Sequence, residues 1–132
     1  MNRMRKVLIA DDEVKVGQLV KRLIQWDRLG LTCIGLVTDG QTAYEKILSE
    51  SPDIVITDIR MPVLTGLEMI QKASEQGVKC HFIVVSGYKY FDYAQKALKY
   101  GVEDYLLKPI DEDELNRQLQ KLVAEEEQRE DK

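Results

Sequence analysis

One carboxylate stands at the end of an apolar run in the middle of the sequence. Residues 53–57 (DIVIT) lead directly into Asp58, which is followed by Arg60 and Pro62. Aspartate is rarely buried unless its charge is paired, so its place at the end of a buried strand needs a reason. Asp58 is either a turn residue or a reactive group, and the residues that follow the other apolar runs bear on that choice.

Three other apolar runs, 6–10, 81–86 and 104–107, also end in polar residues. These residues are Asp11 and Asp12, Ser86, and Lys108. Taken singly, each of them could be a helix cap or a turn residue. If the runs are parallel strands of one sheet, their carboxyl ends meet at one edge, where such sheets bind ligands. The cleft at that edge would hold three carboxylates, a hydroxyl and an ammonium group.

Such a cleft favours metal-assisted phosphoryl chemistry. Three carboxylates at one edge repel each other, and one pKa would rise unless a cation were bound. Carboxylates together with a backbone oxygen suit Mg²⁺, which keeps several waters and takes few protein ligands; Mn²⁺ could substitute. One aspartate is then left to act as a nucleophile and form an aspartyl phosphate. A hydroxyl and a lysine would hold the phosphoryl oxygens.

The elements that position these residues follow from the hydrophobic pattern. The apolar runs are 6–10, 32–38, 53–57, 81–86 and 104–107, and helical spacing of apolar residues follows each of them. Runs that are apolar at nearly every position indicate strands buried on both faces, as in a parallel sheet. The alternation predicts an α/β fold of the (βα)₅ type with an open, doubly wound parallel five-stranded sheet. Gly35 interrupts the second run and favours an edge strand.

Local signals predict where some helices begin and end. Asp39 and Gly40 open the second helix, and Asp111 with Glu114 has the spacing of a capping box for the last one. Gly101 stops the helix that precedes the fifth run. The sole tryptophan, Trp26, is predicted to pack at the end of the first helix.

The composition is that of one globular domain. A length of 132 residues suits a single core, and the net charge of −4 argues against nucleic-acid binding by this segment. Two cysteines, Cys33 and Cys80, are too few for a disulfide framework. No long apolar run or signal sequence is visible, so we expect no membrane contact and a cytoplasmic location. Residues 125–132 are polar throughout and read as a helix end or the start of a linker.

Four motifs, taken together, resemble the receiver domain of bacterial two-component response regulators, which has the chemotaxis-type fold. The motifs are ADDE (10–13), DIRMPVLTG (58–66), VSGY (85–88) and YLLKPI (105–110). The resemblance covers about residues 4 to 124, which places the domain at 1–124. It implies the flavodoxin-like strand order 2-1-3-4-5.

The resemblance also implies roles for the residues at the predicted edge. Asp58 corresponds to the phosphoacceptor. Asp12 corresponds to the direct Mg²⁺ carboxylate, with Asp11 assisting, usually through water. The backbone carbonyl of Arg60 corresponds to the third protein ligand, beside Asp58 itself.

A second group of residues corresponds to the switch that responds to phosphorylation. Ser86 matches the switch hydroxyl, and Lys108 matches the ammonium that binds phosphate. The Lys108–Pro109 bond corresponds to one that is cis in the family. Tyr105 matches the aromatic residue that moves inward when Ser86 moves toward the phosphoryl group.

The implied function is that of a signalling switch rather than a turnover enzyme. Receivers of this kind take a phosphoryl group from a phosphohistidine of a sensor kinase. They dock or form homodimers through their fourth helix, fifth strand and fifth helix. Tyr90, Tyr93 and Tyr100 share one stripe of the fourth helix here, which is either a partner surface or half-buried packing.

The sequence is most similar to receivers joined to AraC-type helix-turn-helix output domains, which control transcription. No such output domain is present in this chain, so DNA binding would come only through it. The chain is either a fragment of such a regulator or a stand-alone receiver.

Three other functions fit a fold of this class. A pseudo-receiver that serves only as an interaction module remains the alternative, although the complete set of edge residues argues against it. A haloacid-dehalogenase-type hydrolase needs a second aspartate two residues after the nucleophile, where this chain has Arg60. A flavodoxin-like carrier needs a phosphate loop after the first strand, where this chain has acidic residues. Cys80 and His81 are adjacent in a predicted strand and point to opposite faces, which argues against a metal pair.

Overall fold

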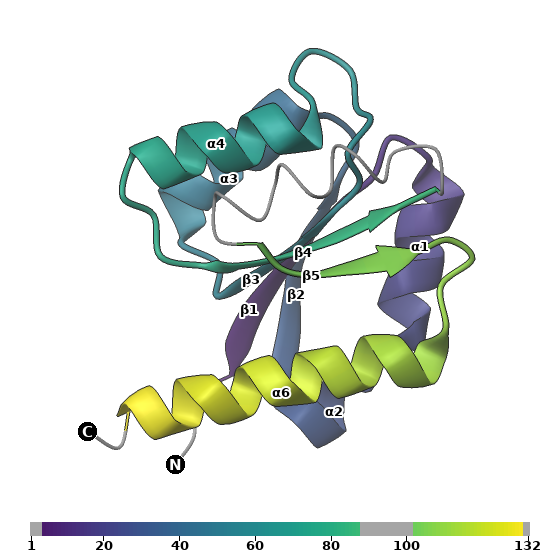
Figure 1. Ribbon diagram of the computed structural model, residues 1–132, viewed down its shortest axis with the longest axis vertical. Helices are drawn as coiled ribbons and strands as arrows, with labels where there is room; N and C mark the ends of the chain where they lie inside the picture. Colours follow the sequence, from purple (N-terminus) through teal and green to yellow (C-terminus); the bar gives the residue numbers. More distant parts are fainter. Residues whose placement is uncertain (1–3, 88–101, 131–132) are drawn as a thin grey trace.

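The computed structural model describes residues 4–87 and 102–130 of the chain. Within them, five strands form one parallel sheet in the order β2-β1-β3-β4-β5 (Figure 1). The strands are β1 (Arg5–Ala10), β2 (Leu31–Val37), β3 (Ile54–Thr57), β4 (His81–Ser86) and β5 (Val102–Leu107). The predicted α/β class and strand order are confirmed, with strand boundaries that differ by up to two residues. The helix predicted before the fifth strand, with its stop at Gly101 and its tyrosine stripe, lies outside the described residues.

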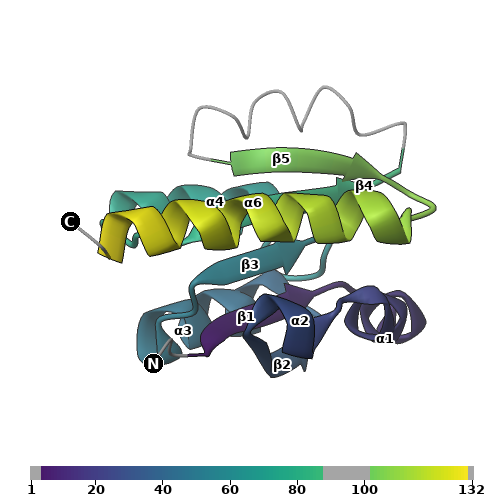
Figure 2. The same ribbon diagram turned by 90° about the horizontal axis from the view of Figure 1, so that it is seen from below.

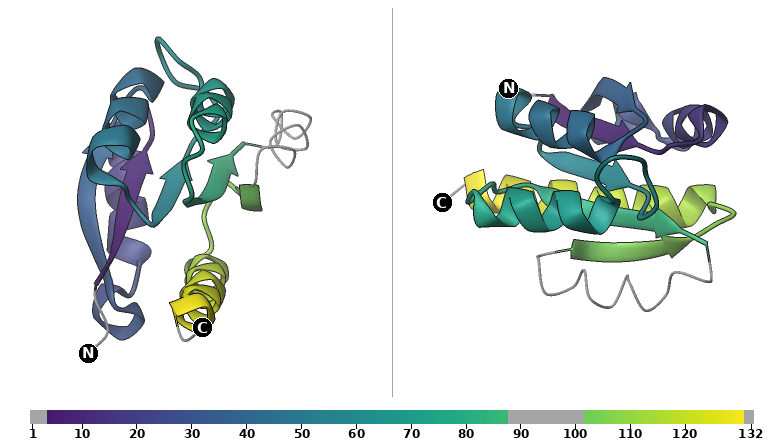
Figure 3. Two further views of the ribbon diagram at one scale, coloured as in Figure 1. Left: turned by 90° about the vertical axis from the view of Figure 1, so that its left-hand side faces the viewer. Right: turned by 90° about the horizontal axis from the view of Figure 1, so that it is seen from above.

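Helices cover both faces of the sheet. One face carries α3 (Gly40–Glu50) and α4 (Gly66–Glu75), and the other carries α1 (Val14–Leu23), α2 (Trp26–Leu29) and α6 (Glu112–Glu130). Figures 1 and 3 show this three-layer arrangement, with α3 and α4 side by side. Every residue of β3 and β4 is buried, which explains why these strands read as unbroken apolar runs. The apolar stripe of α6, which includes Leu115, Leu119 and Leu122, closes the second core.

The second strand lies at an edge of the sheet, as the glycine in its middle predicted. Its pairing with β1 shifts by one residue, because Val7 pairs with Cys33 whereas Leu8 pairs with Gly35. Ile34 is therefore the extra residue of a β-bulge. The ammonium group of Lys46 in α3 reaches the carbonyl oxygen of Ile34 at 3.4 Å.

The prediction that Trp26 ends the first helix is wrong. The first helix ends at Leu23, and Trp26 begins a separate short helix after an extended residue. The cause is a long-range contact with α6. The side-chain amide of buried Asn116 donates to the carbonyl oxygen of Leu23 and accepts from the backbone N–H of Gln25, at 2.8 Å and 2.9 Å. These hydrogen bonds pair the carbonyl of Leu23 and the N–H of Gln25, which a continuous helix would pair with its own backbone groups.

Side-chain caps fix the starts of three helices. Asp39 caps α3, and its carboxylate accepts from the backbone N–H of Thr42 at 2.7 Å. Thr65 and Glu68 form a reciprocal capping box at the start of α4. Before α6, the carboxylate of Asp111 accepts from the backbone N–H of Glu114 at 2.9 Å, as its spacing predicted.

The last helix runs back from the carboxyl edge of the sheet to its amino edge (Figure 2). Its final turns are tied to that edge by a hydrogen bond between His81 and Glu126 at 2.6 Å and an ion pair between Arg5 and Glu130 at 2.9 Å. The polar segment at 125–130 is therefore helix. Across the described ranges, no helix has both the length and the apolar character needed to span a bilayer.

Candidate functional site

The carboxyl ends of the strands converge at one edge and bring the predicted site residues together. Backbone hydrogen bonds of 2.9 Å fix three of them just beyond the strand ends. The N–H of Asp58 donates to the carbonyl oxygen of Ala10, and the N–H of Lys108 donates to that of Ser86. The N–H of Asp11 donates to the carbonyl oxygen of Val37. Asp11, Asp58 and Lys108 are thus each positioned both by the strand they follow and by the end of the adjacent strand.

Lys108 lies between two buried carboxylates. Its Nζ is 2.9 Å from Oδ2 of Asp58 and 3.2 Å from Oδ2 of Asp11, and only 6% and 5% of these two aspartates is exposed. Burial opposes the charge on Lys108, but the hydrogen bond to Asp58 and the attraction of both carboxylates outweigh it and raise the pKa of Lys108. One cation therefore serves two carboxylates, which leaves an excess of negative charge.

The second oxygen of Asp58 is held by the backbone that follows it. Oδ1 accepts a hydrogen bond from the N–H of Ile59 at 2.7 Å and a long one from the N–H of Arg60 at 3.4 Å. The hydroxyl of Thr57 donates to the carbonyl oxygen of Asp58 at 2.8 Å. These contacts fix the orientation of the Asp58 carboxylate within the loop that joins β3 to α4.

That loop contains an unusual turn. The N–H of Leu64 donates to the carbonyl oxygen of Pro62 at 2.7 Å, which closes a γ-turn centred on Val63. Val63 has a φ of 69°, a conformation that is strained for a β-branched residue, and 84% of it is exposed. The N–H of Gly66 then donates to the carbonyl oxygen of Ile59 at 2.7 Å and closes the loop.

An acidic group lies beside Asp58 at the end of β1. Asp11, Asp12 and Glu13 each offer a carboxylate oxygen within 4.8 Å of the others. Burial, backed by the nearby charge of Asp58, raises the pKa of Asp11 against the opposing hydrogen bond from the N–H of Glu13. Asp11 and Asp12 were predicted from the sequence, whereas the closeness of Glu13 was not. The group offers only oxygen ligands and has an unfavourable crowding of charge, both of which fit a hard divalent cation.

Ser86 is fully buried, and its hydroxyl has no hydrogen bond of normal geometry within the ranges that the structure describes. The neighbouring Tyr105 hydroxyl donates to the carbonyl oxygen of Gly87 at 3.1 Å. Burial raises the pKa of Tyr105 and the charge of Asp58 adds to this, while a poorly aligned hydrogen bond with the Ser86 hydroxyl lowers it. An unsatisfied buried hydroxyl is costly, so Ser86 is poised to gain from a new acceptor. The Lys108–Pro109 bond next to this region is cis.

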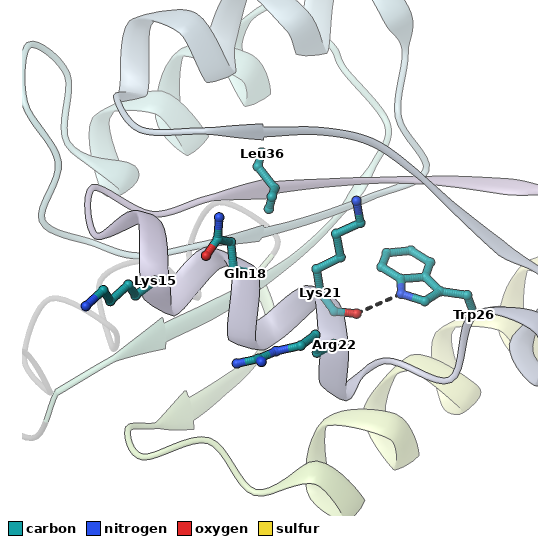
Figure 4. Close-up of a pocket in the computed structure, with 6 residues that line it drawn as sticks. All are labelled: Lys15, Gln18, Lys21, Arg22, Trp26 and Leu36. Atoms are coloured by element: carbon teal, nitrogen blue, oxygen red, sulfur yellow. Dashed lines mark hydrogen bonds between the residues drawn. The ribbon is translucent and has the colours of Figure 1, made fainter.

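A separate cavity of about 810 Å³ lies between α1, α2 and β2 (Figure 4). Its lining residues are Lys15, Gln18, Lys21, Arg22, Trp26 and Leu36. Trp26 packs at one end of it, with its indole N–H donating to the carbonyl oxygen of Lys21 at 2.8 Å. None of the carboxyl-edge residues lines this cavity, so it is distinct from the candidate site.

Comparison with known protein families gives a match over residues 7–120 to the response regulator receiver domain. The chain belongs to this family. The receiver domain is 45% identical over 122 residues to YesN, a transcriptional regulatory protein of Bacillus subtilis. It is 36% identical over 120 residues to HptR, a transcriptional regulatory protein of Staphylococcus aureus. These matches cover 92% and 91% of the receiver domain but only 33% and 47% of the two relatives.

Solved structures agree with this assignment. The receiver domain superposes on the REC domain of AraT, a response regulator from Geobacillus stearothermophilus, with a TM-score of 0.91 and 36% identity. That match covers 96% of this chain and 98% of the AraT domain. A two-component transcriptional regulator AraC from Clostridium phytofermentans gives a TM-score of 0.82 at 30% identity and covers 91% of this chain and 93% of that one.

Proposed function

We propose that this receiver domain is a phosphorylation-controlled switch in which Asp58 accepts a phosphoryl group from a phosphohistidine of a sensor kinase. One observation carries the proposal. The buried carboxylate of Asp58 is bonded to Lys108 at 2.9 Å, beside a crowded acidic group and near an unsatisfied buried hydroxyl. A turn residue or helix cap needs none of these neighbours.

In the proposed transfer, a carboxylate oxygen of Asp58 attacks the phosphorus of the phosphohistidine. A P–O bond forms as the P–N bond breaks, and the imidazole nitrogen keeps the electron pair and is protonated by water. Lys108 already contacts Asp58 and can move onto a phosphoryl oxygen, and Ser86 can donate to another. The N–H groups of Ile59 and Arg60 hold the Asp58 carboxylate in place for the attack.

Four residues would hold a divalent cation, Mg²⁺ or Mn²⁺. They are Asp11, Asp12, Asp58 and Arg60, the last through its backbone carbonyl. When bound, the ion supplies positive charge that offsets the charge of the phosphoryl group. The oxygen-only ligands and the raised pKa of Asp11 support this assignment.

Phosphorylation would act by shifting a conformational equilibrium. It adds about 1.5 to 2 negative charges and new acceptor oxygens at Asp58. Ser86 gains a hydrogen-bond acceptor only in that state, and its movement would let Tyr105 move inward. Interactions that differ between two states are what can bias a pre-existing equilibrium.

The proposed output is control of transcription through a separate domain. The names of YesN and HptR and the small share of them that the chain covers support this. The readout face would comprise β5, α6 and the helix predicted before β5, which carries Tyr90, Tyr93 and Tyr100, and two copies would form a homodimer through this face. DNA binding would come only from the output domain. The domain would work in the cytoplasm as a switch that assists its own phosphorylation and dephosphorylation, not as a turnover enzyme.

The test is incubation with acetyl phosphate and Mg²⁺, followed by measurement of intact mass. We expect the wild type to gain one phosphoryl group and Asp58→Ala to gain none. Asp53→Asn is the matched control, because Asp53 lies at the opposite edge, where it accepts from the backbone N–H of Lys6, and should be phosphorylated normally. If the wild type neither gains a phosphoryl group nor binds Mg²⁺, the proposal fails and an interaction module is left.

A further inference from the structure

The β3–α4 loop, residues 58–66, is braced by a segment that is remote in the sequence. The N–H of Gly40, the first residue of α3, points at the carbonyl oxygen of Pro62 at 3.4 Å. A Cβ built on Gly40 would be 2.6 Å from the carbonyl carbon of Leu64 and 2.9 Å from its Cβ, and nearer still to its carbonyl oxygen. Two of these three atoms are backbone, so any side chain at position 40 must push the loop away.

The start of α3 cannot easily move aside to relieve such a contact. The carboxylate of Asp39 accepts from both the backbone N–H and the hydroxyl of Thr42, at 2.7 Å and 2.8 Å. Ala43 and Ile47 are anchored in the core. Gly40 is itself buried. The loop is therefore the side that would give way.

The same loop is held at its other end by a second close approach. A Cβ on Gly66 would lie 3.0 Å from the carbonyl carbon of Asp58 and 3.1 Å from Cα of Ile59. Gly66 thus approaches the loop at Asp58 and Ile59, and Gly40 approaches it at Leu64. Arg60, whose carbonyl is the proposed cation ligand, lies between these two points of the loop. Two hydrogen bonds of 2.7 Å, from the N–H of Leu64 to the carbonyl oxygen of Pro62 and from the N–H of Gly66 to that of Ile59, close the loop around Arg60, so a displacement at Leu64 is carried to the backbone of Arg60.

We infer that Gly40 is a positioning residue for the cation site: its missing side chain sets how closely the β3–α4 loop approaches α3, and thereby where the carbonyl of Arg60 stands. This inference rests on the proposed function, because it needs a cation at the Asp11, Asp12 and Asp58 edge. It assigns part of the site to a glycine that follows β2, a strand that contributes no ligand. Supporting residues of this kind typically change metal affinity by about 10- to 100-fold when altered.

The experiment measures the Kd of Mg²⁺ by calorimetry for wild type, Gly40→Ala and Gly17→Ala. Gly17 is the matched control, because a Cβ there would make an ordinary contact of 3.6 Å with Leu36. We expect Gly40→Ala to weaken Mg²⁺ binding about tenfold or more and Gly17→Ala to leave it unchanged. Circular dichroism before each titration shows that the variant is folded. A folded Gly40→Ala with the wild-type Kd would overturn the inference.

A second pair of variants decides the matter if Gly40→Ala fails to fold. Asp39→Ala and Asp39→Ser both remove one negative charge, but only serine can still cap α3. We expect a weaker Kd for Asp39→Ala than for Asp39→Ser, because the start of α3 is loosened without any added atom. Equal values would overturn the inference. Failure of the wild type to bind Mg²⁺ would instead refute the proposed cation site itself.

Discussion

The two edges of the sheet bury charge in different ways. At the amino edge, side chains of the strands contact carboxylates of α6: Arg5 pairs with Glu130, and Glu126 contacts both His81 and Arg129. At the carboxyl edge, Lys108 alone is shared between Asp58 and Asp11.

The difference separates a structural use of charge from a chemical one. The amino-edge contacts join α6 to the strands, and among the described residues the Nε of buried Arg5 has no hydrogen-bond partner. Within the described residues, the carboxyl edge has one ammonium group, that of Lys108, against two buried carboxylates, and its buried Ser86 hydroxyl has no well-formed hydrogen bond. Such an edge is stabilised when it binds a cation and a group rich in acceptor oxygens.

Replacement of the shared lysine should have the largest effect. Lys108→Met leaves two buried carboxylates with no ammonium group, and we expect a loss of roughly 2–3 kcal/mol in the free energy of unfolding at pH 7 without divalent cations. Arg5→Met should cost about 1 kcal/mol or less, since Glu130 can return to water. Urea denaturation of both variants checks this. Added Mg²⁺ should stabilise Lys108→Met more than wild type, and equal losses in the two variants would contradict the comparison.

Neutralising the crowded carboxylate should give a smaller effect of opposite sign. The pKa of Asp11 is raised in the folded state, so its stabilising contribution is present below its ordinary value of 3.8 and lost as pH rises through the folded-state pKa. Asp11→Asn should therefore stabilise the cation-free protein at pH 7, with a gain that disappears as the pH falls to the ordinary aspartate value of 3.8. Thermal unfolding across this pH range measures it.

Asp39→Asn, measured by thermal unfolding over the same pH range, should have the opposite effect on stability to Asp11→Asn. Hydrogen bonds from Thr42 lower the pKa of Asp39, so its contribution is present above its ordinary value of 3.8 and lost as pH falls through the folded-state pKa. Asp39→Asn should therefore reduce stability at pH 7. A reduced stability at pH 7 for Asp11→Asn as well would show that the carboxyl edge is not short of cations.

The smallest expected effect concerns backbone strain in the loop of the carboxyl edge. Val63→Gly removes a β-branched side chain from a residue with a φ of 69° and loses little buried surface. We expect a gain of about 0.5–1 kcal/mol in the free energy of unfolding. Ser51→Gly, at a φ of 49° at the end of α3, is the amino-edge counterpart. Its free energy of unfolding should rise by less, because serine has no β-branch and is less strained at positive φ. Denaturant melts of both variants measure the two gains, and a loss for Val63→Gly would show that the turn is not strained.

The parts predicted from the sequence are those with a local cause. Buried parallel strands are largely apolar, so the polar residue at or just after the end of each stood out: Asp11, Asp58, Ser86 and Lys108. The cap at Asp39 and the edge strand at Gly35 were also visible, because capping and strand interruption act over a few residues.

The parts that were missed depend on contacts between distant segments. The break between α1 and α2 is set by Asn116, more than ninety residues away from its backbone partners. The buried Arg5 and the His81–Glu126 contact likewise depend on how far α6 extends along the sheet. Periodicity predicts which face of a helix is buried, but not which polar group it meets at its far end.

The β-bulge at Ile34 bears on how the protein behaves in concentrated solution. A straight edge strand offers unpaired backbone groups to another chain and invites aggregation. In β2 the bulge bends the strand, and the ammonium group of Lys46 donates to the carbonyl oxygen of Ile34, the extra residue. A charged side chain and an irregular hydrogen-bond ladder at the same position make β2 a poor template for a strand of another chain. This favours solubility and leaves the residues of the carboxyl edge unchanged.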